Sequence, residues 1–218
     1  MRYKLLDYVL DLLYPTRCIF CRRSMPPGKP GICPICAVRL PFTADGGRRR
    51  GDYFAECVSA LYYEDSVREA IHRYKFNGVQ AYAEAFGELT ASCIYENLRG
   101  EFDILSWVPL DPRRRRSRGY DQAELITREV GKRLCRKPET VLKKRRGVHP
   151  QSHTGSPEDR KANIAGAYRA IDPDKVAGKR RLLIDDVVTT GSTLSECAKT
   201  LLQAGAEEVR CATLASTR

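Results

Sequence analysis

The sequence lacks several features that would each place it in a known class. No run of its 218 residues approaches the roughly eighteen apolar residues of a membrane-spanning helix. It has neither the G-x-x-x-x-G-K-[ST] pattern of a P-loop nor the glycine fingerprint of a Rossmann site, which argues against both nucleotide-binding classes. It also has no internal repeat and no long low-complexity segment.

The N-terminal segment 1–15 is apolar but is not predicted to be a signal peptide. Asp7 and Asp11 interrupt it, and no small-residue cleavage site follows. Its leucines and valine recur at helical spacing up to Pro15, which predicts a short amphipathic helix. We therefore expect a cytoplasmic protein without membrane insertion.

The chain has fewer acidic than basic residues. The chain has 27 Asp and Glu against 38 Lys and Arg, which gives a formal net charge of +11. Such a balance implies acidic partners, namely nucleic acid, phosphorylated metabolites or anionic lipid.

Four of the nine cysteines form a C-x2-C-x11-C-x2-C array: Cys18, Cys21, Cys33 and Cys36. A reducing compartment disfavours disulfides, whereas four thiolates suit tetrahedral Zn²⁺. A redox pair needs only one C-x2-C and a thioredoxin-like βαβ context, which is absent here. Four protein ligands leave no open position, so the array predicts a structural zinc ribbon. The other five cysteines stand singly in apolar patterns and are interpreted as core residues.

Beyond residue 51 the pattern alternates between strands and helices, which predicts an α/β domain with a mostly parallel sheet flanked by helices. Residues 44–52 are interpreted as a linker. We therefore divide the chain into residues 1–50, with the N-terminal helix and zinc ribbon, and residues 51–218. Strands are expected at 56–63, 103–110, 181–186 and 208–215, and helices at 65–76, 81–98, 121–134 and 193–205.

The segment "LLIDDVVTTGST" (182–193) combines a buried strand, two acids and a hydroxyl-rich turn. Ligands of parallel sheets bind beyond the carboxyl ends of the strands, where Asp185 and Asp186 are expected. The turn leads into a helix whose free N–H groups suit a phosphate. A single acid is usually just solvated and a single Ser or Thr usually caps a helix. The ordered combination instead offers acceptors for hydroxyl groups or a metal beside donors for a phosphate, as a phosphorylated sugar requires.

This segment resembles the phosphoribosyl-pyrophosphate (PRPP) motif of type I phosphoribosyltransferases. The resemblance implies that Asp185 and Asp186 bind the ribose 2′ and 3′ hydroxyls. It assigns the 5′ phosphate to Thr189, Thr190, Gly191, Ser192 and Thr193. Branches acting on 6-oxopurines usually carry an Asp at the position of Thr189, so this chain does not resemble a hypoxanthine-type enzyme.

Two further segments resemble the ComF competence-protein family, also called the GntX-like family. "VPLDPRRRRSRGYDQAELI" (108–126) fits the signature V-P-L-x-x-x-R-x-x-x-R-G-F-N-Q-A, with Tyr120 and Asp121 in place of Phe and Asn. The matching residues are Arg114, Arg118, Gly119, Gln122 and Ala123. "QSHTGSPEDRKANIAGAY" (151–168) matches in Gln151, Arg160, Asn163 and Tyr168, although "SHTGSP" departs from the family's usual leucine-containing stretch.

The resemblance implies a type I phosphoribosyltransferase domain with an N-terminal zinc ribbon that binds Mg²⁺ and PRPP. Arg114 and Arg118 would lie in a loop that stabilises the departing pyrophosphate during transfer to a nitrogen acceptor. Two other basic groups, residues 48–50 and 143–146, could follow a nucleic-acid backbone. The alternative is a non-catalytic PRPP sensor, or a protein that handles single-stranded DNA with the DNA-uptake machinery. The sequence leaves open whether the chain is an enzyme, what its acceptor is and whether it forms oligomers.

Overall fold

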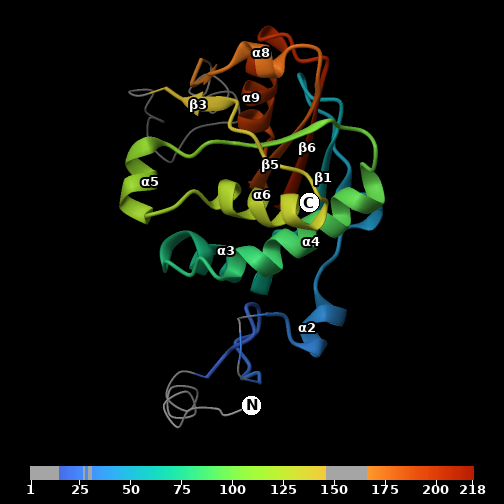
Figure 1. Cartoon of the computed structure of the whole chain (residues 1–218). Coiled ribbons are helices and arrows are strands. Elements are labelled where there is room, and N and C mark those ends of the chain that lie inside the picture. The colour runs from blue at the N-terminus through green and yellow to red at the C-terminus, as the bar shows by residue number, and fades with distance from the viewer. Residues whose placement is uncertain (1–14, 27, 29–30, 146–165) are drawn as a thin grey trace.

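The structure, a computed structural model, describes residues 15–26, 28, 31–145 and 166–218, which contain a four-stranded parallel sheet (Figure 1). Its strand order is β1-β6-β5-β2, so β5 and β6 occupy the middle. The strands are β1 (Cys57–Tyr62), β2 (Ile104–Trp107), β5 (Arg180–Val188) and β6 (Glu208–Ser216). These strands and their parallel pairing confirm the predicted sheet.

Helices cover both faces of the sheet. One face carries α3 (Asp65–Phe76), α4 (Tyr82–Asn97) and α6 (Gln122–Arg133), whose apolar side chains share one core with Leu182 and Ile184 of β5. The other face carries α8 (Pro173–Val176), α9 (Ser192–Gln203) and an antiparallel pair, β3 (Leu142–Lys144) with β4 (Tyr168–Ala170). A second core there includes Leu183. No helix in these described ranges is long and apolar enough to cross a membrane.

Strand β5 extends past the two acids, whereas the sequence predicted its end there. It pairs with β6 as far as Val188, opposite Ser216. On its other side the ladder stops at Ile184, because β2 ends at the facing Trp107. Asp185 and Asp186 therefore lie where β5 has lost one neighbour. Since successive strand residues point to opposite faces, the two carboxylates flank the sheet from both sides.

The four long helices confirm their predicted positions within two residues, but the arginine run differs. Residues 112–118 form a helix, α5 (Pro112–Arg118), where a loop was expected. Asp111 caps it by accepting hydrogen bonds from the N–H groups of Arg113 and Arg114, at 2.9 and 3.4 Å. Pro112 follows at the first helical turn, where a proline is well tolerated.

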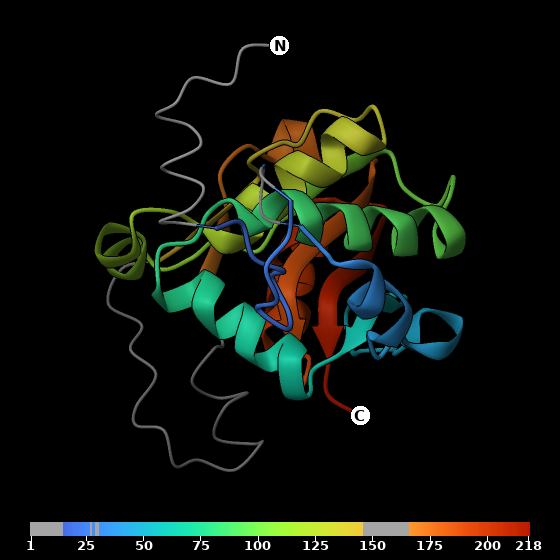
Figure 2. The same ribbon diagram turned by 90° about the horizontal axis from the view of Figure 1, so that it is seen from below.

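The cysteine module, residues 15–43 with α2 (Pro34–Arg39), lies against α3 and α4 (Figures 1 and 2). Ile19 and Phe20 are almost completely buried, and the rings of Phe20 and Phe86 of α4 have their centroids 6.2 Å apart. Arg73 of α3 donates a hydrogen bond to the carbonyl of Ile19 at 2.8 Å. The module thus supplies side chains to the core of the α/β unit.

Residues 44–52 are not a free linker. They contain the short 3-10 helix η1 (Ala44–Gly47), which packs against β1. Arg49 and Cys57 exchange two backbone hydrogen bonds, of 2.9 and 2.7 Å. The segment interpreted as a linker is therefore packed against β1, through backbone hydrogen bonds with Cys57 that its charged and glycine-rich composition does not indicate. The division at residue 50 remains a prediction, and the helix expected before Pro15 lies outside the described residues.

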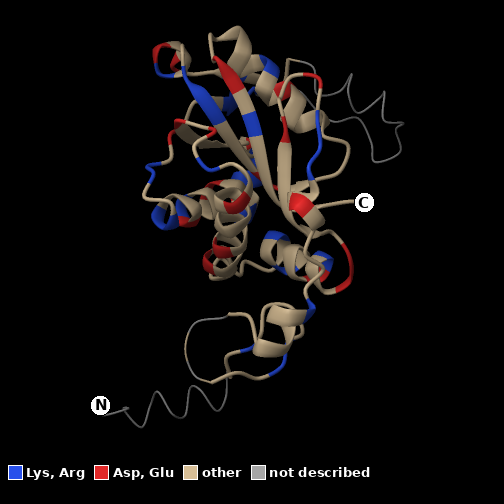
Figure 3. Cartoon of the chain, turned by 90° about the vertical axis from the view of Figure 1, so that its right-hand side faces the viewer, with Lys and Arg blue, Asp and Glu red and all other residues tan. Residues whose placement is uncertain are grey.

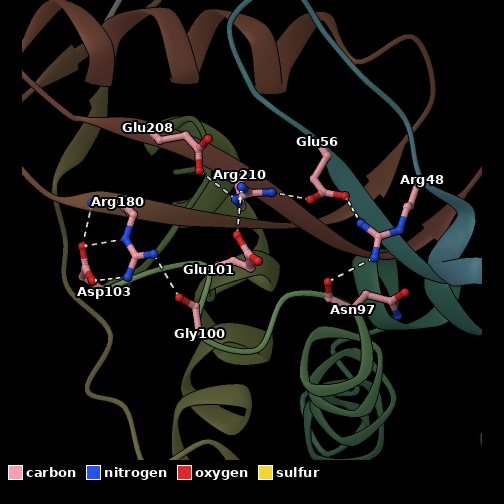
Figure 4. Close-up of polar contacts among 9 residues, drawn as sticks. All are labelled: Arg48, Glu56, Asn97, Gly100, Glu101, Asp103, Arg180, Glu208 and Arg210. Carbon is pink, nitrogen blue, oxygen red and sulfur yellow. Dashed lines mark hydrogen bonds and ion pairs between the residues drawn. The ribbon is translucent and has the colours of Figure 1, made fainter.

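Charged residues crowd the amino-terminal ends of the strands (Figures 3 and 4). Arg180 holds Asp103 through two nitrogens, at 2.8 and 3.4 Å. Arg210 forms ion pairs with three glutamates, and one of these glutamates also binds Arg48. The glutamates are Glu56, Glu101 and Glu208. These ion pairs link β6 to the segments that precede β1 and β2, and β5 to the residue that precedes β2, at the edge opposite the two acids.

Candidate functional site

A cavity of about 320 Å³ opens at the carboxyl edge of the sheet. It collects side chains from both faces and from the segments after β2. Its polar lining residues are Lys75, Asp111, Arg114, Arg118, Asp121, Gln122, Lys144, Tyr168, Asp185, Asp186 and Thr193. The cavity therefore brings together the two acids, the two signature arginines and the last residue of the hydroxyl-rich turn.

Lys75 forms an ion pair with the second acid that the sequence did not reveal. Its Nζ lies 2.9 Å from Oδ2 of Asp186, with side chains 24% and 11% exposed. The other acid, Asp185, accepts a hydrogen bond at 2.8 Å from the N–H of Asp186. That N–H is free for this bond because β2 has already ended.

Asp185 holds its proton more tightly than an exposed carboxyl does. Burial, followed by the charge of Asp186, raises the pKa of Asp185 to about 8, while Lys75 acts in the opposite direction. Two carboxylates this close cannot both ionise easily without a nearby cation. Lys75 supplies that cation, so the acid pair and the lysine form one electrostatic unit.

The predicted phosphate loop joins β5 to α9. Gly191 is the N-cap residue of α9 and has a φ of 78°, in the left-handed region that glycine adopts readily. No side chain caps the helix. The hydroxyls of Thr190 and Ser192 are 3.0 Å apart, so they hydrogen-bond to each other. Thr189 and Thr190 are exposed, and Thr193 lines the cavity.

Helix α5 separates the arginines by face. Arg114 and Arg118 are four residues apart, so they lie on the same face and both line the cavity. Arg115 points elsewhere, to an ion pair with Glu124 at 3.0 Å. Arg118 donates to Oε1 of Gln122 at 2.6 Å and its guanidinium lies 4.9 Å from the centre of the Phe76 ring. Only part of the arginine run therefore faces the site.

Asp121, which replaces the family's Asn, has a structural role. It caps α6 by accepting from the N–H of Glu124 at 3.2 Å, and its other oxygen accepts from Leu110 at 2.7 Å. Asn in this geometry could make only one of the two bonds, because its amide nitrogen donates and cannot accept from a backbone N–H. Burial raises the pKa of Asp121, although the two backbone donors oppose this. The substitution thus keeps the signature helix attached to the end of β2.

The sequence did not place Lys75, Phe76, Lys144 or Tyr168 at the site, although Tyr168 matched a family position and Lys144 belonged to a predicted basic group. For Lys75 a signal existed, because it stands four residues after Ile71 on the buried stripe of α3, where a lysine is unusual. Lys144 and Tyr168 come from β3 and β4, and the Lys144 Nζ lies 5.4 Å from the centre of the Tyr168 ring. The pairing of these two short strands spans more than twenty residues, so no local pattern indicates it.

The four cysteines of the array meet in space. Their sulfur atoms all lie within 4.8 Å of one another, and those of Cys21 and Cys33 are 3.7 Å apart. Tetrahedral zinc with bonds of about 2.3 Å needs sulfurs about 3.8 Å apart, so the cluster fits such an ion. Burial opposes ionisation of Cys18, but N–H donors of Cys33, Cys21 and Phe20 outweigh it and lower its pKa to about 6.

Comparison with known proteins agrees with this geometry. The family model for the phosphoribosyl transferase domain matches residues 123–218. The DNA utilization protein YhgH of Escherichia coli is 31% identical, over 91% of this chain and 96% of its own. The chain belongs to the ComF family. Competence protein F of Haemophilus influenzae is 27% identical over 89% and 94%, and competence protein ComFC of Streptococcus pneumoniae 26% over 68% and 62%.

The family match confirms the type I phosphoribosyltransferase fold, with its parallel sheet flanked by helices and a four-cysteine cluster near the N-terminus. The regulatory enzyme of purine biosynthesis, a solved structure, aligns with a TM-score of 0.44 and 23% identity, covering 62% of this chain and 26% of that one. The family positions Gln151, Arg160 and Asn163 lie outside the described residues, whereas Tyr168 lines the cavity.

Proposed function

We propose that this ComF-family protein binds PRPP with Mg²⁺ in the carboxyl-edge cavity and transfers its phosphoribosyl group to a nitrogen acceptor. One observation carries the proposal: a single cavity gathers Asp185 and Asp186, the end of the hydroxyl-rich turn, and Arg114 and Arg118. These are the groups that a ribose diol, a 5′ phosphate and a pyrophosphate require, and they come from distant parts of the chain.

Each group has a distinct task. The two carboxylates accept hydrogen bonds from the ribose 2′ and 3′ hydroxyls, and the loop donates to the 5′ phosphate. The attacking nitrogen forms its bond to the anomeric carbon as the bond to pyrophosphate breaks and the leaving oxygen takes the electron pair. Arg114 and Arg118 stabilise the negative charge that develops there. The nitrogen then releases its proton.

Both metals fit the donors present. Mg²⁺ is usually held by one or two carboxylates together with substrate phosphates, and Asp185 and Asp186 are the carboxylates available. When bound it supplies charge neutralisation to the pyrophosphate. Zinc would be held by Cys18, Cys21, Cys33 and Cys36, with a structural role only.

The described residues of the cavity offer no obvious general base to remove the proton from the acceptor nitrogen. Asp111 and Asp121 line the cavity but are committed to capping α5 and α6. Thr189 stands where 6-oxopurine enzymes carry an acid. Among the described residues no carboxylate other than the ribose-binding pair is left for this task, so we propose an acceptor that loses its proton readily.

The experiment is calorimetric titration of Mg²⁺–PRPP into Asp185→Asn/Asp186→Asn. Charge-assisted hydrogen bonds contribute about 1.5–3 kcal/mol each, so affinity should fall by about two orders of magnitude or more. Asp103→Asn, at the opposite edge, is the control and should bind normally. Unchanged affinity in a folded double variant would refute the ribose-binding role.

A second candidate is DNA handling without catalysis. Arg113, Arg115 and Arg116 are exposed on α5, and so are Lys143 and Arg145 further along the chain. The names of the relatives refer to DNA utilization and competence. The basic group at residues 48–50 is reduced, since Arg48 binds Glu56 and Arg49 binds the carbonyl of Thr189. In the group at residues 143–146, Arg146 lies outside the described residues. Pyrophosphate release with candidate nucleobases separates the two: a DNA-handling protein binds an oligonucleotide salt-dependently and releases none.

A further inference from the structure

The carbonyl of Thr189, at the start of the predicted phosphate loop, is held by two donors from distant segments. Nη1 of Arg49 donates to it at 2.9 Å across 140 residues, and the hydroxyl of Thr217 donates at 3.4 Å. Both donors are themselves fixed. The backbone of Arg49 bridges to Cys57, and the N–H of Thr217 donates to the carbonyl of Val188 at 3.1 Å.

Holding this carbonyl fixes the N–H that follows it. In a planar trans peptide the C=O of one residue and the N–H of the next point in opposite directions, and the chain has no cis peptide among its described residues. The N–H of Thr190 must therefore point away from Arg49. Gly191 comes next in the left-handed conformation, and such a turn gathers successive N–H groups into a concave anion site.

The segment that carries Arg49 also supports the loop sterically. A Cβ built on Gly191 would lie 3.8 Å from the ring of Phe54, which is buried. The ammonium of Lys199 on α9 lies 5.4 Å from the centre of the Tyr53 ring. Residues 49–54 thus back both the loop and the helix that follows it.

We propose that Arg49 is a positioning residue that orients the Thr189–Thr190 peptide so that the loop binds a phosphate monoester. This inference rests on the proposed function and assigns the ligand at the loop as the 5′ phosphate end of the sugar. Arg49 acts through the peptide rather than by touching the ligand, and its positive charge behind the loop favours a dianion in front of it.

The neighbouring arginines cannot take over this role. Arg48 is committed to Glu56 and to the carbonyl of Asn97, at 3.2 Å for the latter (Figure 4). Arg50 is exposed. Thr189 is exposed as well, so water can satisfy its carbonyl when Arg49 is absent. Replacing Arg49 should therefore leave the fold intact and loosen the orientation of one peptide.

The test uses ribose 5-phosphate, which presents the monoester without pyrophosphate, and inorganic pyrophosphate as a second probe. Arg49→Met should weaken ribose 5-phosphate binding about tenfold, the effect of one ordinary hydrogen bond. Arg49→Lys should restore most of it, because a lysine can still donate to the carbonyl. Arg50→Met is the matched control and should bind like the wild type. Pyrophosphate should bind all four proteins equally.

A spectroscopic readout separates positioning from general loss of structure. The amide proton of Thr190 should shift downfield when ribose 5-phosphate binds the wild type, and this shift should be absent or much smaller in Arg49→Met. If Arg49→Met does not fold, Thr217→Val removes the second donor and should weaken binding about threefold.

The outcomes distinguish the two proposals. If ribose 5-phosphate binds the wild type and Arg49→Met with equal affinity and equal Thr190 shifts, the role of Arg49 is overturned and the proposed function is not. Where Arg49→Met is unfolded, wild-type affinity and an unchanged Thr190 shift in Thr217→Val would overturn the claim that the held carbonyl of Thr189 orients the loop. A wild-type protein that binds neither ribose 5-phosphate nor PRPP would overturn the proposed function and this inference with it.

Discussion

Replacing Lys75 by methionine removes the cation from the acid pair while keeping most of the apolar stem. The Lys75–Asp186 contact of 2.9 Å is largely shielded from water, with side chains 24% and 11% exposed. At an effective dielectric constant near 20 its gross attraction is about 6 kcal/mol. Removing one partner of a fully buried pair costs about 3–5 kcal/mol, and the remaining exposure reduces this. We expect Lys75→Met to lose about 2 kcal/mol of unfolding free energy at pH 7.

The pH dependence of this loss follows from Asp185. Its pKa is raised to about 8 by burial and by Asp186, so between about pH 4 and 8 the folded state binds more protons than the unfolded state. Wild-type stability contributed by this group therefore falls as the pH rises through that window. Without Lys75 the pKa rises further, so the variant continues to lose stability above pH 8. The deficit should be larger at pH 9 than at pH 6.

The assay is urea unfolding of wild type and Lys75→Met at pH 6, 7.5 and 9. Lys143→Met, an exposed lysine on β3, is the control and should change the unfolding free energy by less than about 0.5 kcal/mol. In a double-mutant cycle with Asp186→Asn, the two changes should be non-additive by about 2 kcal/mol. If Lys75→Met loses the same unfolding free energy at every pH, or if the double-mutant cycle is additive, Lys75 and the two acids do not form an electrostatic unit.

Two further predictions concern the cysteine module and the core. The purified protein should contain one zinc per chain by elemental analysis, and Cys33→Ser should lose it and expose residues 15–43 to limited proteolysis; a fully protected, metal-free module would contradict this. Arg181 is fully buried and its three guanidinium nitrogens find no hydrogen-bond partner in the described structure, while burial lowers its pKa. Arg181→Met should therefore raise the unfolding free energy by about 1–3 kcal/mol in urea titrations, and a less stable variant would show that the charge is needed.

Local sequence patterns, such as the apolar stripe of a helix, were sufficient to predict most of the fold. The helix at 65–76 was predicted with its observed bounds because Val67, Ala70, Ile71 and Tyr74 mark a continuous buried stripe. The helix α5 had a local signal that was overlooked: an Asp followed by Pro is a favourable N-cap and first helical residue. The end of β5 was misplaced because the acids were taken to end the strand. Pairing with Ala215 and Ser216 extends it, and no sequence pattern on β5 itself reports that partner.

The candidate site was predictable where it follows one strand and not where it crosses the fold. The two acids and the turn after them share one segment, and their spacing alone indicates a sugar-phosphate site. Lys75, Lys144 and Arg49 reach the same edge from α3, β3 and the segment before β1. Their partners at this edge lie more than twenty residues away in the sequence, so spacing can mark Lys75 as unusual but cannot reveal which groups these three residues meet.

The two edges of the sheet differ in how their positive charges are compensated. At the amino-terminal edge, Arg48, Arg180 and Arg210 are bound by carboxylates, so the charges of these three arginines are locally compensated (Figure 4). At the carboxyl edge, Arg114, Arg118 and Lys144 line the cavity, and the acids there are partly occupied with Lys75 and with helix caps. A polyanion diffusing toward the protein is therefore attracted to the edge at which we propose that a ribose diol binds. Charge alone would favour any polyanion, whereas under the proposed function the paired acids restrict the choice to one that carries neighbouring hydroxyl groups.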